Sequence, residues 1–267
     1  MPVDNLTTLL KAVKDIALEA GKKIMAIYGT EFQVDRKSDQ SPLTEADMAA
    51  HHCIVNALGK LAGYPVLSEE SAAIPFSERR SWQTYWLVDP LDGTREFVKR
   101  NGDFTVNIAL IHRHKPVLGV VYVPVTRQCY SAAEGAGAFR QDPGSPAQAI
   151  RVRSRAPEKP LVTGSRSHVT PELQSYLARL PEHELLSIGS SLKFCLVAEG
   201  KADLYPRLGP TSEWDTAAAQ CVVEQAGGLV TDLQGRELRY NDKESLLNPC
   251  FLVFGDRSID WASYAKN

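Results

Sequence analysis

The sequence predicts a mixed α/β protein built from two halves. An α+β half with long N-terminal helices and a largely antiparallel sheet is expected at 1–152, and an α/β half at 153–267. Three observations predict this. Residues 5–28 repeat apolar side chains at helical spacing. Short apolar strands separated by turn residues follow one another over 85–133, which is typical of an antiparallel meander. Beyond residue 160 strand and helix patterns alternate, as in α/β proteins.

Two helices are expected near the N-terminus. The first covers 5–28 and is followed by Gly29, a residue that commonly ends helices. The second covers 44–61. Thr44 and Asp47 have the spacing of a capping box at the start of this second helix, with Asp in place of the more usual Glu.

The strands of the first half are short and apolar. Tyr85–Asp89 is a continuous apolar run, which suits a strand buried on both faces, and Pro90 is expected to end it. Further strands are expected at Thr105–Ile111, Val117–Val123 and Cys129–Ala133.

The second half follows a connecting passage at 141–160 that is rich in Pro, Gly, Ser and Arg. One short strand is expected within this passage, near Ile150–Val152. The expected strands beyond it cover 161–164, 184–188, 202–205, 229–231 and 251–254, and the expected helices cover 171–180, 190–199 and 215–226.

Composition and charge exclude several classes of protein. The chain has 267 residues, 43% of them hydrophobic and 23% charged, which argues against a disordered or fibrous protein. Thirty Lys and Arg against 32 Asp and Glu leave a net charge of −2, so no nucleic-acid partner is expected. The five cysteines contain no C-x-x-C pair that would indicate a zinc or redox site. No signal peptide or membrane-spanning run is expected. We therefore expect a cytoplasmic protein and leave open weak attachment to the inner face of a membrane.

The hexapeptide that begins at Asp89 brings together several polar groups that could take part in catalysis. Asp89 ends an expected strand, Asp92 follows three residues later, and Gly93 allows a tight turn. Thr94 can begin a helix whose first N–H groups would face an anion. The segment thus offers two carboxylates, the Leu91 carbonyl and a backbone suited to phosphate. An Asp N-cap followed by a Gly turn would explain the same residues without any function.

Two further acidic pairs weaken that simpler explanation. Glu69 and Glu70 follow an apolar run, and Glu213 and Asp215 open an expected helix. Clustered carboxylates cannot all ionise side by side without cations. Oxygen ligands with no Cys or His nearby favour Mg²⁺. Beside a turn that suits phosphate, they indicate metal-assisted hydrolysis of a phosphate ester.

These motifs resemble the inositol monophosphatase superfamily, whose members are lithium-sensitive, magnesium-dependent phosphomonoesterases. They span nearly the whole chain in the order of that family. The resembling segments are S-P-L-T-E-A-D (41–47), S-E-E (68–70), W-L-V-D-P-L-D-G-T (86–94) and E-W-D-T-A-A-A…E-Q-A-G-G (213–228). The resemblance implies a layered αβαβα sandwich of the inositol monophosphatase and fructose-bisphosphatase type, with the active site in a cleft between two subdomains.

Within that superfamily, other segments resemble the bacterial 3′(2′),5′-bisphosphate nucleotidases. These segments are G-S-R-S-H (164–168), the stretch 189–207 and G-P-T-S-E-W-D-T-A-A (209–218). This resemblance implies hydrolysis of 3′-phosphoadenosine 5′-phosphate, and of its sulfated form, during sulfate assimilation. The partner would be a small bisphosphate nucleotide, and the protein a monomer or homodimer. An inositol or sugar phosphatase on the same scaffold and a non-catalytic phospho-ligand binding protein remain alternatives.

The resemblance also implies a metal centre and a catalytic pair. The centre would hold about two to three Mg²⁺ ions on oxygen ligands. Its implied ligands are Glu69, Asp89, the Leu91 carbonyl, Asp92 and Asp215. Thr94 and Asp47 are expected to deprotonate the attacking water, and Glu69 to assist catalysis by holding the water of a third, weaker metal. Lys37 and Glu70 are expected near the metals.

The substrate contacts implied by the resemblance lie in both halves. The Gly93 and Thr94 N–H groups are expected to bind the phosphate that is cleaved. The residues expected to contact the rest of the substrate are Ser165, His168, Gly189, Lys193 and Glu213.

Overall fold

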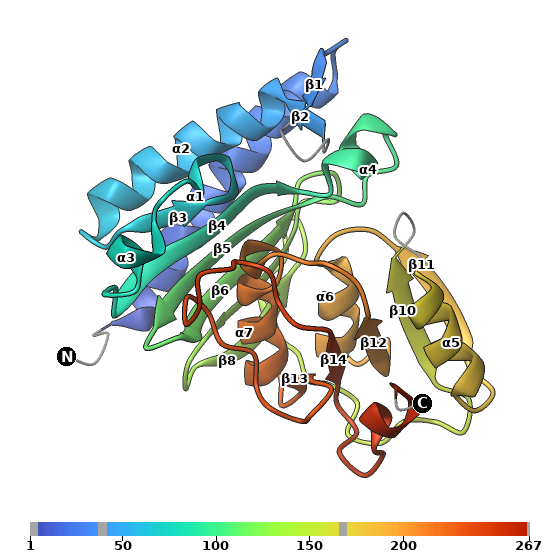
Figure 1. Cartoon of the computed structure of the whole chain (residues 1–267). Helices are drawn as coiled ribbons and strands as arrows, with labels where there is room; N and C mark the ends of the chain where they lie inside the picture. Colours follow the sequence, from blue (N-terminus) through green and yellow to red (C-terminus); the bar gives the residue numbers. More distant parts are fainter. Residues whose placement is uncertain (1–4, 37–41, 166–169, 266–267) are drawn as a thin grey trace.

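The computed structural model describes residues 5–36, 42–165 and 170–265. They form two large β-sheets and three helical layers, stacked in the order helix, sheet, helix, sheet, helix (Figure 1). The layered αβαβα sandwich implied by the resemblance is therefore confirmed. Within the described ranges, no helix is both long and apolar enough to cross a membrane.

Helices α1 (Leu6–Tyr28) and α2 (Glu45–Leu61) form the first layer (Figure 1). Both predicted helices are confirmed. Thr44 and Asp47 form the predicted capping box at the start of α2, which leaves few backbone N–H groups of the first turn without a partner. The apolar faces of both helices pack on the first sheet in one hydrophobic core. This packing fixes the start of α2, and with it Asp47, relative to the sheet.

The first sheet has seven strands in the order β3-β4-β5-β6-β7-β8-β9. β3 and β4 run parallel, and every later neighbour pair is antiparallel. The strands are β3 (Val66–Ser68), β4 (Thr84–Asp92), β5 (Thr105–His112), β6 (Lys115–Val123), β7 (Gln128–Ala133), β8 (Gly137–Gln141) and β9 (Gln148–Ala149).

The central strands of this sheet are buried on both faces. Along β4, Trp86 and Val88 pack toward α1 and α2, whereas Tyr85 and Leu87 pack on the opposite side. Successive side chains of a strand point to opposite faces, so helices on both sides require an unbroken apolar run. The sequence Y-W-L-V therefore follows from the position of β4 between two helical layers.

The middle layer consists of α6 (Leu192–Ala198) and α7 (Ala217–Gln225). Both lie between the two sheets and share one core with them. Gly119 of β6 faces the backbone of Ala218 so closely that a Cβ at position 119 would collide with the Ala218 carbonyl. Glycine at this position lets α7 approach the sheet directly.

The second sheet has five strands in the order β11-β10-β12-β14-β13. Its strands are β10 (Leu161–Ser165), β11 (Glu184–Ile188), β12 (Leu204–Arg207), β13 (Leu229–Asp232) and β14 (Phe251–Phe254). Helix α5 (Pro171–Arg179) and the short helix η3 (Trp261–Ala265) cover its outer face. Both neighbours of β10 run parallel to it, whereas β14 pairs antiparallel with β12 and β13.

Short elements complete the fold and supply much of the functional region. They are the paired strands β1 (Val34–Arg36) and β2 (Pro42–Thr44), the helices α3 (Phe76–Arg79) and α4 (Thr94–Val98), and the 3₁₀ turns η1 (Glu69–Ser71) and η2 (Glu213–Asp215). The helix predicted at 215–226 is thus preceded by the η2 turn and begins at Ala217.

The connection between the sheets differs from the prediction. The short strand expected near Ile150–Val152 is present but lies slightly earlier, at Gln148–Ala149. It pairs with β8, a strand that the sequence pattern did not predict. Gly137 lies at positive φ at the start of β8, so a turn there returns the chain alongside β7. The division of the chain at 152 remains a prediction, and the core around α7 is continuous with both sheets.

Candidate active site

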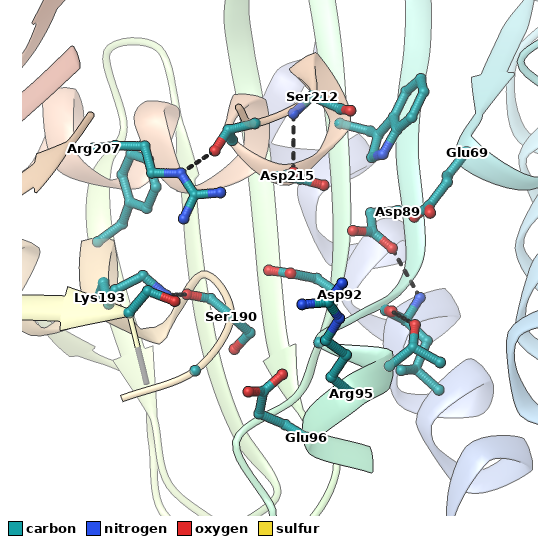
Figure 2. Close-up of a pocket in the computed structure, with 18 of the residues that line it drawn as sticks. Glu69, Asp89, Asp92, Arg95, Glu96, Ser190, Lys193, Arg207, Ser212 and Asp215 are labelled. Atoms are coloured by element: carbon teal, nitrogen blue, oxygen red, sulfur yellow. Dashed lines mark hydrogen bonds between the residues drawn. The ribbon is translucent and has the colours of Figure 1, made fainter. Parts of the chain in front are cut away.

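A cavity of about 340 Å³ opens between β4 with α4 on one side and α6, β12 and η2 on the other. Many of the predicted site residues line it. They are Glu69, Asp89, Leu91, Asp92, Gly93, Thr94, Ser165, Gly189, Lys193 and Asp215. Figure 2 shows Glu69, Asp89, Asp92 and Asp215 toward one side of this cavity and Lys193 and Arg207 toward the other, with Arg95 beside Asp92 and Glu96 below them. The fold therefore gathers segments that lie far apart in the sequence into one charged cleft.

A β-bulge brings both aspartates of β4 into this cleft. The strand does not end at Pro90 as predicted but continues to Asp92, with a register shift against β5. Asp89 pairs with Asn107 and Asp92 with Thr105, so three steps on β4 match two on β5. In a regular strand, residues three apart face opposite sides of the sheet. The extra residue of the bulge turns Asp92 to the same side of the sheet as Asp89, and both carboxylates line the same cavity.

Three carboxylates converge at the acidic side of the cleft. Oxygens of Glu69, Asp89 and Asp215 all lie within 4.8 Å of one another. Burial, together with the charges of Glu69 and of the neighbouring aspartates, raises the pKa of Asp89 well above its usual range. Burial, followed by the charges of Asp92 and Glu69, raises the pKa of Asp215 to about 8. Such a group favours a bound cation, and its hard oxygen donors suit Mg²⁺.

Asp92 lies outside this group of three but at its edge (Figure 2). Burial raises the pKa of its carboxyl, while Lys193 and hydrogen bonds from Ser191 and Asn107 act in the opposite direction. The charge of Asp92 in turn contributes to the raised pKa values of Asp89 and Asp215. All four carboxylates therefore belong to one electrostatic cluster.

Thr94 and Asp47 form the expected hydrogen-bonded pair at the border of the cavity. The Thr94 hydroxyl lies 3.1 Å from Asp47 Oδ1 and 3.3 Å from the Leu91 carbonyl. Asp47 Oδ2 accepts hydrogen bonds from the Thr44 backbone N–H at 2.7 Å and the Thr44 hydroxyl at 2.6 Å. The capping box of α2 thus orients the Asp47 carboxylate toward Thr94.

The opposite side of the cleft carries basic side chains. Lys193 is only 4% exposed, and its ammonium donates to the carbonyls of Ser190 at 2.6 Å and Ile188 at 3.3 Å. Burial lowers the pKa of Lys193 to about 8, although the charge of Asp92 opposes this shift. Arg207 ends β12 and donates hydrogen bonds to Thr211 and to the Pro210 carbonyl.

Arg207 lines the cavity but was not singled out from the sequence. The sequence did hold a signal for Arg207: an arginine stands at the end of the apolar stretch L-Y-P-R, where a strand end can reach a site. Arg95, Ser190 and Trp214 also line the cavity and were likewise missed. Isolated polar residues are usually only exposed, so their position in a cleft is visible only in the fold.

Other predicted residues have different surroundings. Glu213 is fully buried behind the cavity, where it accepts hydrogen bonds from the Asn241 backbone N–H and from Lys243, and burial raises its pKa to about 7. The Cα of Gly189 lies so close to Asp103 and Glu96 that a Cβ would approach their atoms to 2.7 Å.

Three further predictions have other outcomes. Glu70 lies in η1 beside Glu69 but is not among the residues around the cavity. Lys37 and His168 fall outside the described residues.

Comparisons with known proteins match nearly the whole chain and agree with the family resemblance of its motifs. The model of the inositol monophosphatase family matches residues 5–257. A protein of Salmonella typhimurium named 3′(2′),5′-bisphosphate nucleotidase CysQ is 54% identical over 248 residues, which are 92% of this chain and 99% of that protein. The crystal structure of CysQ from Bacteroides thetaiotaomicron is 44% identical, with a TM-score of 0.82, and covers 94% of this chain and 98% of its own. An inositol monophosphatase structure from Anabaena has a TM-score of 0.75 at 25% identity, covering 97% and 95%. The chain therefore belongs to the inositol monophosphatase family.

Proposed function

We propose that this protein is a Mg²⁺-dependent 3′(2′),5′-bisphosphate nucleotidase. It removes the 3′-phosphate of 3′-phosphoadenosine 5′-phosphate, and also acts on the sulfated form, to leave the 5′-nucleotide and phosphate. One observation carries this proposal: the cleft has two zones of opposite charge. Carboxylates that suit cations stand on one side, and Lys193 and Arg207 stand on the other. A substrate with two phosphates can use both zones.

The carboxylate zone fits divalent cations. Oxygens of Glu69, Asp89 and Asp215 lie within 4.8 Å of one another, and bound cations would offset their combined charge. We assign Glu69, Asp89, the Leu91 carbonyl, Asp92 and Asp215 as the residues that would hold about two to three Mg²⁺ ions. When bound, Mg²⁺ supplies positive charge that offsets the phosphate and makes water more acidic.

Thr94 and Asp47 would remove a proton from the attacking water. The Thr94 hydroxyl donates toward Asp47 Oδ1, which leaves its oxygen lone pairs available to a proton from the cavity side. Because the Thr44 groups already occupy Asp47 Oδ2, the other oxygen is fixed as the acceptor for Thr94. Water can thereby lose its proton to Thr94 as Thr94 passes its own proton to Asp47.

The basic zone would hold the phosphate that is not cleaved. The two carbonyl hydrogen bonds of Lys193 fix its ammonium in place, so little side-chain freedom is lost when an anion binds. Arg207 adds a second cation on the same side. Ser165 and Gly189 line the cavity and are proposed to contact the nucleotide, whereas the buried position of Glu213 removes it from the proposed contacts. Since one chain supplies all of these groups, a monomer would suffice for catalysis.

Phosphate release from two substrates tests the proposal. The 3′,5′-bisphosphate nucleotide and inositol 1-phosphate are compared at equal concentration, with Mg²⁺ and with a chelator. We expect a kcat/KM at least about tenfold higher for the nucleotide, in line with one additional charged hydrogen bond. No release is expected with the chelator. An equal or higher value for inositol 1-phosphate would show that the protein is an inositol phosphatase. No hydrolysis of either ester would favour a binding protein.

A further inference from the structure

Two buried polar residues outside the predicted site surround the Asp92 carboxylate. Ser191 precedes α6, and Asn107 lies between apolar residues of β5. Each is 1% exposed. A buried polar side chain costs free energy unless its hydrogen bonds are satisfied, so their partners indicate what these residues do.

All donors to Asp92 within the described residues reach the same oxygen. Asp92 Oδ2 accepts from the Ser191 backbone N–H at 2.7 Å, the Ser191 hydroxyl at 2.9 Å and the Asn107 amide at 3.2 Å. The Thr105 hydroxyl lies farther away, at 3.4 Å, and has Asn107 Oδ1 at 3.0 Å as a nearer acceptor. The carboxylate is therefore held by one oxygen, and Oδ1 is left for another ligand.

Ser191 also connects Asp92 with Asp215. Its Oγ accepts a hydrogen bond from the Asn107 amide at 2.9 Å, and the Asp215 backbone carbonyl lies 2.8 Å from it. The hydroxyl has one proton, which Asp92 Oδ2 and the Asp215 carbonyl share as acceptors. One side chain thus joins the bulged strand β4 to the η2 turn across the cleft.

The position of Ser191 before a helix has an ordinary explanation that the structure excludes. A serine at an N-cap usually accepts a hydrogen bond from a backbone N–H of the first helical turn. Ser191 makes no such side-chain bond to α6. Its hydroxyl is directed to the acidic cluster instead, and α6 begins without this stabilisation.

We infer that Ser191 and Asn107 are positioning residues for the cation site that Asp92 shares with Asp89 and Asp215. By engaging Oδ2, they fix the rotamer that presents Oδ1 to the cation. Through Ser191, they also fix the separation between Asp92 and Asp215. The inference rests on the proposed function for the identity of the metal and for the assignment of Asp92 as one of its ligands. Partners that orient metal ligands in this way typically contribute 10- to 100-fold in metal affinity.

Binding of Mn²⁺ alone, followed by the electron paramagnetic resonance signal of the free ion, tests this inference without substrate. Ser191→Ala keeps the backbone N–H bond to Asp92 and removes only the hydroxyl. We expect the dissociation constant of at least one Mn²⁺ to rise about tenfold. The Mg²⁺ concentration for half-maximal hydrolysis should rise by a similar factor, while the rate at saturating Mg²⁺ recovers most of its value. Asn107→Ala should produce the same pattern.

A matched control separates positioning from a general effect of losing a buried hydroxyl. Ser131 on β7 is 2% exposed and does not line the cavity, so Ser131→Ala should change Mn²⁺ affinity by less than about twofold. If Ser191→Ala does not fold, Ser191→Cys keeps the size of the side chain but donates only weakly, and should raise the dissociation constant about threefold or more.

The outcomes distinguish this inference from the proposed function. A folded Ser191 variant that binds Mn²⁺ like the wild type overturns the inference, even if the wild type hydrolyses the bisphosphate. An equal loss in Ser131→Ala overturns it as well. Weakened Mn²⁺ binding in Ser191→Ala, in a protein whose wild type does not hydrolyse the nucleotide, supports the inference and contradicts the proposed function.

Discussion

The two sides of the cleft are built in different ways. The acidic side is built around one continuous motif at the end of β4, to which η1 adds Glu69 and η2 adds Asp215. The capping box of α2 and hydrogen bonds from Ser191 and Asn107 support this motif. The basic side is assembled from separate segments: Lys193 comes from α6 and Arg207 from β12. Its edge strand β11 is exposed along most of its length. We infer that the acidic side sets the chemistry and the basic side sets the choice of substrate.

The largest effect should follow from removing a carboxylate of the acidic side. We expect Asp89→Asn to lower kcat by more than about a thousandfold for every substrate, since a bound metal contributes several kcal/mol. Asp142→Asn, on an exposed loop paired with Arg140, is the matched control and should change kcat less than about twofold. Steady-state rates and circular dichroism check the result. A folded Asp89→Asn protein with near wild-type turnover would remove the acidic side from the mechanism.

A smaller loss should follow from breaking the pair formed by Thr94 and Asp47. Thr94→Val keeps the shape of the side chain and removes the hydroxyl that donates to Asp47. Proton transfer by a positioned group contributes about 100-fold or more, so kcat should fall by about that factor while Mn²⁺ binding is retained. Thr94→Ser keeps the hydroxyl and should stay within about tenfold. Equal rates in both variants would contradict the proposed proton path.

Lys193 tests the basic side, because its loss should affect one substrate and spare another. We expect Lys193→Met to lower kcat/KM for the bisphosphate nucleotide by about 10- to 150-fold, the equivalent of one charge-assisted hydrogen bond. A phosphate ester without the second phosphate should change by less than about threefold. Lys201→Met, an exposed lysine paired with Glu199, is the control. Equal losses on both substrates would mean that the ammonium mainly supports its own loop through the Ser190 carbonyl.

The smallest effect concerns a carboxyl group outside the cleft. Burial raises the pKa of Glu224 on α7 to about 7, from an ordinary value near 4.5. Between these two pKa values the folded protein retains a proton that the unfolded chain has lost. The contribution of Glu224 to the free energy of unfolding is therefore greatest below about pH 4.5 and declines as the pH rises to about 7. In Glu224→Gln, the free energy of unfolding should fall by about 1–3 kcal/mol less over this pH range than in the wild type.

Chemical denaturation of Glu224→Gln and the wild type between pH 4.5 and 8 provides the measurement. The difference in unfolding free energy between the two proteins should change across this interval, while the pH profile of kcat stays the same. A parallel pair of stability curves would show that Glu224 does not titrate there. A shifted rate profile would mean that charges outside the cleft also affect catalysis.

The acidic side could be predicted from the sequence because most of its residues are close together along the chain, and because the acidic pairs that contain Glu69 and Asp215 were visible as separate clusters. Asp89, Leu91, Asp92 and Thr94 fall within one hexapeptide, and all of them line the cavity. The basic side could be predicted only in part. Arg207 follows Lys193 by 14 positions, but the pattern L-Y-P-R does not show that the end of β12 faces the same cavity as Lys193.

Ser191 and Asn107 show a second limit of sequence reasoning. Asn107 interrupts the apolar strand T-V-N-I-A, a visible signal for a buried polar contact, but the pattern does not identify its partner. The partner depends on the approach of α6 to β5 across the cleft, a tertiary contact between residues 84 positions apart. The continuation of β4 through Pro90 was missed for a related reason: proline disfavours a regular strand, but a bulge accommodates it.

The β-bulge in β4 has a consequence for how this chain can change in length during evolution. The single extra residue between Asp89 and Asp92 decides which face of the sheet each aspartate occupies. Deleting one residue at Pro90 or Leu91 would leave the two aspartates two apart and still on one face of a regular strand. It would, however, remove the bulge in which the Leu91 backbone N–H donates to Asp89 Oδ1 at 3.0 Å and the Leu91 carbonyl lies 3.3 Å from the Thr94 hydroxyl. The loop between β8 and β9 has no such role and can gain or lose residues freely. Descendants of this gene should therefore preserve the number of residues at the bulge even where neighbouring loops have changed in length.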